Sequence, residues 1–285
     1  MWFERRTLDE VAAVAQTVSM GGTARIIAGT IAVALSSAAA AEDVAPICAA
    51  RPGKSTPPCT VPAGHFQVEM GLVDWSKQES GGERDTSLVL GETTFKYGLT
   101  DRADIEVDVT PWQRASNRIA GHRDSASGLG DLVFAFKQQV TESDGPVQAA
   151  LLPFVKAPTA KHSLGNGKWE AGLAAPIGIA LGKSPFSLGL TPEIDWAANA
   201  DGHGHHAAMV QVASLGWAAT DKLSLSGELW GQWDWDPSGT NRQYSADASV
   251  AYVANSNLQL DAGTNFGLNR NAPDVEIYSG LSVRF

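Results

Sequence analysis

The stretch D-V-E-I-Y-S-G-L-S-V-R-F, residues 274–285, ends the chain and alternates apolar with polar side chains. The apolar side chains occupy one set of alternate positions and the polar ones the other: Val275, Ile277, Leu281, Val283 and Phe285 against Glu276, Tyr278, Ser282 and Arg284. A period of two residues is that of a β-strand, in which successive side chains point to opposite faces. The stretch therefore predicts a strand with one apolar and one hydrated face.

This ending resembles the C-terminal strand of bacterial outer-membrane β-barrels, in which a final phenylalanine and the alternation before it are read by the barrel assembly machinery. The resemblance implies an assembly signal formed by Ile277, Leu281, Val283 and Phe285. It also implies two partners, the lipid of the outer membrane and the assembly machinery. A strand of a soluble sandwich can look similar, so the rest of the chain has to repeat the pattern.

The alternation does repeat along the chain after Pro62. Twelve segments show it: 64–75, 87–98, 104–109, 130–140, 147–156, 169–182, 186–198, 207–220, 222–234, 242–253, 257–268 and 274–285. Most have the length that a tilted strand needs to cross a membrane. In segment 207–220 the phase of the alternation is ambiguous. The expected fold is all-β, a closed antiparallel transmembrane barrel of about 12 strands, in which the last strand pairs with both 257–268 and the first segment.

One segment shows directly that a face of the barrel meets water. Asp104, Glu106 and Asp108 alternate with apolar residues. Unpaired carboxylates buried in an apolar core cost several kcal/mol each, so this face has to be hydrated. The opposite, apolar face is then the one that meets lipid.

Connector lengths support the same topology. Connectors after the even-numbered segments are short, for example 99–102 and 220–221, whereas those after the first, third and fifth are long and polar: 76–86, 113–129 and 158–168. Outer-membrane barrels have short periplasmic turns and longer outside loops, and an even number of strands places both ends of the barrel in the periplasm. Tryptophans near segment ends, such as Trp75, Trp112 and Trp196, are typical of interfacial girdles.

The N-terminal region predicts export. Arg25, the apolar run 26–35 and the small residues 36–41 have the order of a secretory signal, so we expect residues 20–41 to be a signal peptide and 1–19 to be upstream sequence ahead of the start codon at Met20. An amphipathic anchor helix is the alternative for 1–19. Residues 42–62 are expected to be a periplasmic N-terminal segment and 63–285 the outer-membrane barrel of a Gram-negative bacterium. In that oxidising compartment Cys48 and Cys59, which flank a proline-rich loop, are expected to form a disulfide.

Charged residues in register with the hydrated face are candidates for lining a solute path. They are Glu69, Glu92, Lys96, Asp104, Glu106, Asp108, Asp131, Lys137, Lys156, Glu170, Glu193, Asp195, Glu228, Asp247, Asp261, Glu276 and Arg284. One interpretation is a hydrated passage that favours cations or neutral solutes. The other is that these charges pair across strands and fill a narrow barrel. The net charge of -10 argues against nucleic acid as a partner.

Two motifs could indicate a metal site or an enzyme active site. His203, His205 and His206 could bind a metal ion, but they lie in an expected outside loop, so no metal or cofactor is expected. A twelve-stranded outer-membrane phospholipase family uses a serine, a histidine and an asparagine on the barrel wall. Adjacent residues of a strand face opposite sides, so His162 does not serve Ser163, and neither catalytic residues nor enzyme activity are expected.

Three stretches together resemble a family of outer-membrane transporters named after a meta-pathway of phenol degradation. They are C-A-A-R-P-G-K-S-T-P-P-C-T-V-P-A-G-H-F-Q-V-E (Cys48 to Glu69), F-K-Y-G-L-T-D-R-A-D-I-E (Phe95 to Glu106) and G-L-G-D-L-V-F-A-F-K (Gly128 to Lys137). The resemblance implies a β-barrel that moves small, aromatic or hydrophobic solutes passively across the outer membrane. Two alternatives stay open, a plugged barrel with a structural or surface-interaction role, with residues 48–59 as the plug, and a lipid-modifying enzyme.

Overall fold

The computed structural model describes residues 46–285, so the expected signal peptide 20–41 and the upstream segment 1–19 lie outside the described residues. The described residues form 16 β-strands: β1 Phe66–Ser80, β2 Glu83–Leu90, β3 Glu92–Thr100, β4 Ala103–Val109, β5 Trp112–Ile119, β6 His122–Gly128, β7 Leu132–Gln139, β8 Val147–Ala157, β9 Glu170–Ala174, β10 Ile177–Ala180, β11 Phe186–Ala198, β12 His205–Ala218, β13 Leu223–Asp236, β14 Gly239–Asn255, β15 Leu258–Gly267 and β16 Val275–Arg284. Within 46–285 no helix is long and apolar enough to cross a membrane.

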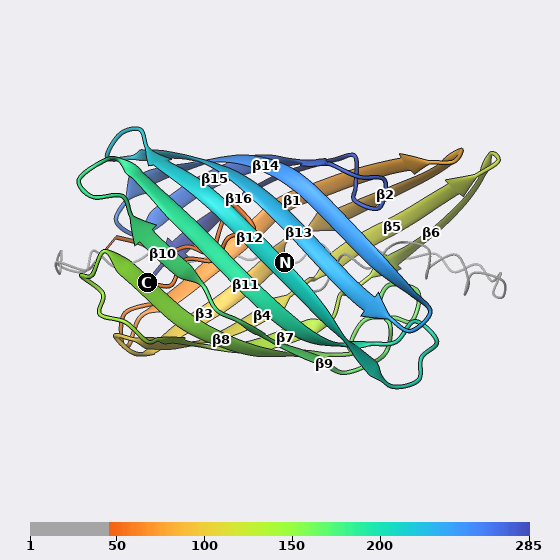
Figure 1. Ribbon diagram of the computed structural model, residues 1–285, viewed down its shortest axis with the longest axis horizontal. Helices are drawn as coiled ribbons and strands as arrows, with labels where there is room; N and C mark the ends of the chain where they lie inside the picture. Colours follow the sequence, from red (N-terminus) through yellow and green to blue (C-terminus); the bar gives the residue numbers. More distant parts are fainter. Residues whose placement is uncertain (1–45) are drawn as a thin grey trace, which may run out of the picture.

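These strands build one closed antiparallel barrel (Figure 1). It counts as 12-stranded, as predicted, because four of its strands are each interrupted once: β2 with β3, β4 with β5, β6 with β7, and β9 with β10. The C-terminal strand β16 pairs with β15 on one side and with β1 on the other, where Val283 lies opposite Val68. The predicted closure is therefore confirmed, and no edge of the barrel is left open.

The distribution of side chains is the reverse of that in a soluble protein. On β16, Ile277 is 53% exposed whereas Glu276, the residue before it, is only 2% exposed. The same holds on β4, where Ile105 is exposed and Asp104 is buried. Apolar side chains cover the outside and charged ones the inside, which is stable only when the outside meets lipid. The chain is an outer-membrane β-barrel.

Two of the three expected outside loops are strands, and the sequence prediction is wrong there. Residues 76–86 form a hairpin between β1 and β2, and 113–129 form another between β5 and β6, with tight turns at Gly81–Gly82 and Ala120–Gly121. Together β2, β5, β6 and the end of β1 make a ribbon that we name the strand extension, and it projects beyond the barrel (Figure 1). The prediction failed because these residues are polar on both faces, and outside the membrane no apolar face is required. The third expected loop, 158–168, contains no strand.

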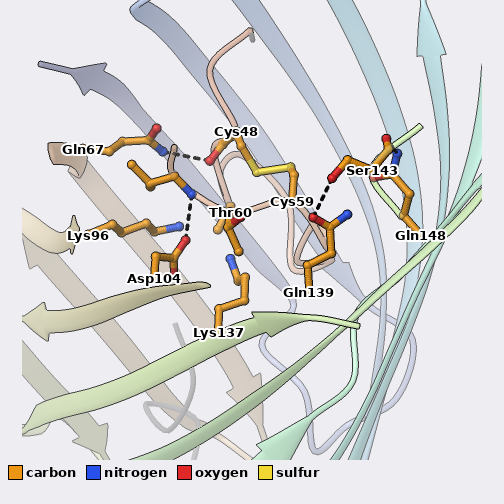
Figure 2. Close-up of a disulfide and its surroundings, with 12 residues drawn as sticks. Cys48, Cys59, Thr60, Gln67, Lys96, Asp104, Lys137, Gln139, Ser143 and Gln148 are labelled. Carbon is orange, nitrogen blue, oxygen red and sulfur yellow. Dashed lines mark hydrogen bonds between the residues drawn. A yellow bond between two sulfur atoms is a disulfide. The ribbon is translucent and has the colours of Figure 1, made fainter. Parts of the chain in front are cut away.

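The residues ahead of β1 lie inside the barrel, and we name 46–65 the luminal segment. Its disulfide between Cys48 and Cys59 is present, as predicted (Figure 2). The segment enters at the end that carries the short turns, where the Gly64 amide donates to the Gly98 carbonyl oxygen at 2.9 Å. The described part of the stretch expected in the periplasm, 42–62, therefore occupies the lumen.

Candidate functional site in the barrel lumen

Most of the charged residues assigned to the hydrated face are buried against the inner wall. These are Glu69, Lys96, Asp104, Glu106, Asp108, Lys137, Lys156, Glu170, Glu193, Asp195, Glu228, Asp247, Asp261, Glu276 and Arg284. Glu92 at the start of β3 is half-buried, and Asp131, also half-buried, precedes β7. Alternation along the strands places these side chains on one face, and barrel closure turns that face inward.

A first group of charges pairs across β1, β3, β4 and β7. Lys96 Nζ lies 2.6 Å from Glu69 Oε1 and 3.8 Å from Glu106 Oε1, and Lys137 Nζ lies 2.9 Å from Glu106 Oε1. The register explains this geometry, because Lys96 is directly opposite Glu106 and Asp104 is directly opposite Lys137. At this part of the wall the charges pair with one another, which is the space-filling interpretation.

A second group lies towards the other end of the barrel. Lys156 Nζ is 2.7 Å from Glu170 Oε2 and 3.2 Å from Asp131 Oδ2. The Asn166 side chain joins the group, since its oxygen accepts from Lys156 and its nitrogen donates to Glu170. These contacts tie the loop after β8 to the wall and leave the centre of the lumen to other residues.

The luminal segment supplies two cations to the acidic wall. The first is Arg51, whose Nη2 lies 3.0 Å from Asp261 Oδ1. Its guanidinium lies against Gly71 and Gly280, which are opposite each other on β1 and β16. A Cβ at position 280 would come within 2.5 Å of Arg51 Nε, so the wall accepts this side chain because these positions are glycines.

The second cation is Lys54. Its Nζ lies 3.0 Å from Asp247 Oδ2 and 4.6 Å from the centre of the Trp230 ring, a cation–π contact. Its backbone amide donates to Glu228 Oε2 at 2.7 Å. Gly53 lies so close to the Glu228 carboxylate that a Cβ there would be 2.3 Å from Oε1. The segment is therefore docked on carboxylates of the wall.

Two of the predicted residues lie away from this docked segment. Glu276 accepts a hydrogen bond of 2.8 Å from Asn265 Nδ2 on the neighbouring strand. Arg284 donates to Asn257 Oδ1 at 2.9 Å and to the Ser256 carbonyl oxygen at 3.1 Å. Arg284 thus lies at the end of the barrel with the short turns, where it holds the turn between β14 and β15.

A cavity of about 120 Å³ remains in the lumen beside the docked segment. Its acidic side chains include Glu92, Glu193 and Asp195, and its basic ones include Lys54 and Arg51. Glu193 and Asp195 face the cavity from β11. Charge pairs and the docked segment thus fill part of the lumen, and a cavity with both acidic and basic lining remains in the rest.

The apolar side of this cavity is formed by residues that the sequence did not predict as lining. Ala208, Val210 and Val212 of β12 line it together with Trp230 of β13. The signal was present, because segment 207–220 carries apolar residues on both faces and its phase is ambiguous for that reason. In a barrel with a hydrated lumen, a strand that is apolar on both faces indicates an apolar patch inside. This strip gives the cavity one apolar and aromatic wall and one acidic wall.

The histidine cluster makes no metal centre in the described part of the chain. Within 46–285 no group of three or more His, Cys, Asp or Glu side chains is arranged to hold a metal ion. His205 stacks on Trp196 with ring centres 3.6 Å apart, and His206 Nδ1 lies 2.9 Å from Asn199 Oδ1. The histidines therefore brace the connection between β11 and β12.

Comparison with known proteins agrees with this architecture. A family model described as "Putative MetA-pathway of phenol degradation" matches residues 49–285. No curated protein matches the sequence. Among solved structures, the COG4313 outer membrane channel from Pseudomonas putida F1 superposes with a TM-score of 0.63 at 17% identity, covering 82% of this chain and 99% of that one. The Ralstonia pickettii toluene transporter TbuX gives a TM-score of 0.43 at 9% identity, covering 80% and 92%.

Proposed function

The chain belongs to this phenol-degradation family of outer-membrane barrels, and we propose that it is a channel for the passive passage of small aromatic solutes across the outer membrane. The observation that supports this proposal is the cavity left in the lumen, whose walls differ in polarity. The barrel is closed, so a solute that crosses it has to pass through the lumen, and our proposal places its path through this cavity.

The size and lining of the cavity favour a single aromatic ring. Its volume of about 120 Å³ is of the same order as the roughly 150 Å³ engineered cavity that holds benzene in another protein. Val210, Val212 and Trp230 offer an apolar and aromatic surface, whereas the opposite wall offers acceptors for a hydroxyl. Phenol, to which the family's description refers, combines these two properties.

The charges of the lining predict the ionic selectivity of the channel. The residues that line the cavity include six carboxylates, Glu69, Glu92, Glu106, Glu193, Asp195 and Asp234, and three cations, Arg51, Lys54 and Lys96, so acidic groups outnumber basic ones. Like charges along a narrow passage attract ions of opposite sign. The channel should therefore conduct K⁺ in preference to Cl⁻.

A planar bilayer experiment tests the proposal. The folded protein should raise the ionic conductance above that of the protein-free bilayer, and phenol should reduce this current reversibly by occupying the cavity. Glucose, which is larger than phenol and has no aromatic ring, serves as the control solute and should leave the current unchanged. A current that phenol and glucose affect equally would contradict the assignment of aromatic solutes.

A second candidate function is a barrel without transport, and the docking of the luminal segment favours it. Arg51, Lys54 and the backbone around them bind the wall through several hydrogen bonds and ion pairs. If these contacts persist at all times, the folded protein conducts no ionic current in the bilayer. In that case the exposed strand extension, and not the lumen, carries the function. Turnover of phospholipid by the purified protein is expected to be absent under either function.

A further inference from the structure

The strand extension segregates its charges by face. Trp75 is opposite both Ile277 and Leu88, and Leu88 is opposite Arg114, so these four side chains lie on the outward face that continues the lipid-facing surface. Side chains alternate between the two faces along each strand, so these four residues assign every other charged residue of the extension to the outward or the inward face. The outward ones are Lys77, Glu79, Arg84, Arg114, Arg118 and Arg123, and the inward ones are Glu83, Asp85 and Asp124. A chain with a net charge of -10 thus places five cations and one carboxylate on this face.

Three of the arginines form a row across neighbouring strands. Arg118 on β5 is directly opposite Arg84 on β2 and directly opposite Arg123 on β6. Like charges directly opposite each other destabilise a sheet. Glu79 pairs with Arg84 and also with Lys77, and Arg118 has no carboxylate partner among residues 46–285. All three arginines are exposed. The row therefore has an excess of positive charge that an external anion can neutralise.

The position of the arginine row indicates which external anion would neutralise it. The extension lies at the end of the barrel opposite the short turns, which is the extracellular end. Trp75 and Trp112 lie on the outward face at the base of the extension, and aromatic residues of this kind mark the membrane interface. The arginines follow them by a few residues, at the level of the lipid headgroups of the outer leaflet.

We propose that Arg84, Arg114, Arg118 and Arg123 bind the phosphate groups of lipopolysaccharide, the anionic glycolipid of the outer leaflet. The guanidinium group binds phosphate in a bidentate manner, and arginines placed on three adjacent strands suit a ligand with more than one phosphate. Basic clusters beside a membrane-spanning segment bind anionic lipids in the same way. The strand extension is then a lipid-binding surface that continues the barrel wall above the hydrocarbon core.

A binding experiment tests this surface. The full barrel is placed in nanodiscs of neutral lipid, and fluorescent lipopolysaccharide is titrated while its anisotropy is measured. The triple substitution Arg84→Gln, Arg118→Gln and Arg123→Gln should weaken binding by about tenfold or more, since each basic residue near a charged surface contributes on the order of 1 kcal/mol. The control is Arg102→Gln in the turn at the opposite end of the barrel, which should leave binding unchanged. Heat-modifiable electrophoretic migration verifies that each variant is folded.

Two further arms identify the ligand. Lipopolysaccharide from which the phosphates have been removed should bind the wild-type barrel as weakly as the intact glycolipid binds the triple variant. Inorganic phosphate at a concentration equal to that of the glycolipid should not displace it. Equal affinities of the wild type and the triple variant would overturn the proposal. Equal binding of the dephosphorylated glycolipid, or displacement by inorganic phosphate, would overturn the assignment to the lipid.

Discussion

Arg51 of the luminal segment binds Asp261 of β15 with two nitrogens, Nη2 at 3.0 Å and Nε at 3.2 Å from the same carboxylate oxygen. The two residues are 210 positions apart in the chain, so this contact forms only when the barrel has closed around the segment. Gly71 and Gly280 leave the space in which the guanidinium lies. The wall and the segment are thus shaped for each other, and displacement of the segment is the step that should control passage.

Replacing Arg51 by glutamine should favour the displaced state of the segment. Asp261 would lose its buried cationic partner, and breaking such a pair costs about 3 kcal/mol. That free energy corresponds to an increase of up to about 100-fold in the ratio of displaced to docked segment. Single-channel recording should show this as a higher open probability. The control variant, Arg102→Gln, removes an arginine of the exposed turn and should behave as the wild type.

Removing the disulfide should have a related but smaller effect. Cys48 and Cys59 are 11 positions apart. Closing a loop of this size lowers the entropy of the unfolded segment and thereby stabilises the folded segment by about 2 to 3 kcal/mol. The double variant Cys48→Ser and Cys59→Ser should keep the barrel intact while the current becomes noisier and larger on average. A current trace indistinguishable from that of the wild type would show that the loop stays docked without its covalent link.

Filling the cavity with a larger side chain should reduce passage through the lumen. Val212→Trp adds a large side chain to the apolar strip next to Trp230, so both the ionic current and the block by phenol should decrease. The neighbouring residue Ala213 is exposed on the outer face, and Ala213→Trp is the matched control, which should change neither quantity. Equal effects of the two substitutions would mean that the cavity is not on the conducting path.

The buried charge pairs of the wall should matter for stability rather than for passage. Lys137→Met leaves Glu106 without its partner at 2.9 Å, and loss of one member of a buried pair costs about 3 to 5 kcal/mol. The double variant Lys137→Met and Glu106→Gln removes the uncompensated charge and should recover part of that loss. Urea unfolding in lipid vesicles measures both free energies. A single variant as stable as the wild type would show that Lys96, whose Nζ lies 3.8 Å from Glu106 Oε1, neutralises this carboxylate without Lys137.

The barrel could be predicted from the sequence because membrane strands need an apolar face, and that face is visible as a period of two. Pairing of the last strand with the first follows from this alternation, and the disulfide of Cys48 with Cys59 follows from the expected export and the proline-rich loop between them. The strand extension could not be predicted in this way, since outside the membrane Arg118 and its neighbours need no apolar alternation. The docking of the luminal segment was even harder to predict from the sequence, because the contact of Arg51 with Asp261 depends on closure of the whole barrel.

The candidate site shows the same division. Alternation assigned Glu193 and Asp195 to the inner wall, and both are buried there. Which charges pair depends on strand register: Lys96 lies opposite Glu106 because the turn between β3 and β4 contains a register shift that the pattern of residue types does not reveal. The apolar strip with Val212 was missed because an apolar residue was assumed to face lipid.

If residues 46–65 close a passage through the lumen, deleting residues 46–60 should open it, and the conductance of the folded barrel in a planar bilayer measures this directly. We expect a stable, cation-selective current several times that of the wild type, in the range of about tenfold if the docked state dominates in the wild type. A folded deletion variant whose conductance equals that of the wild type would contradict it.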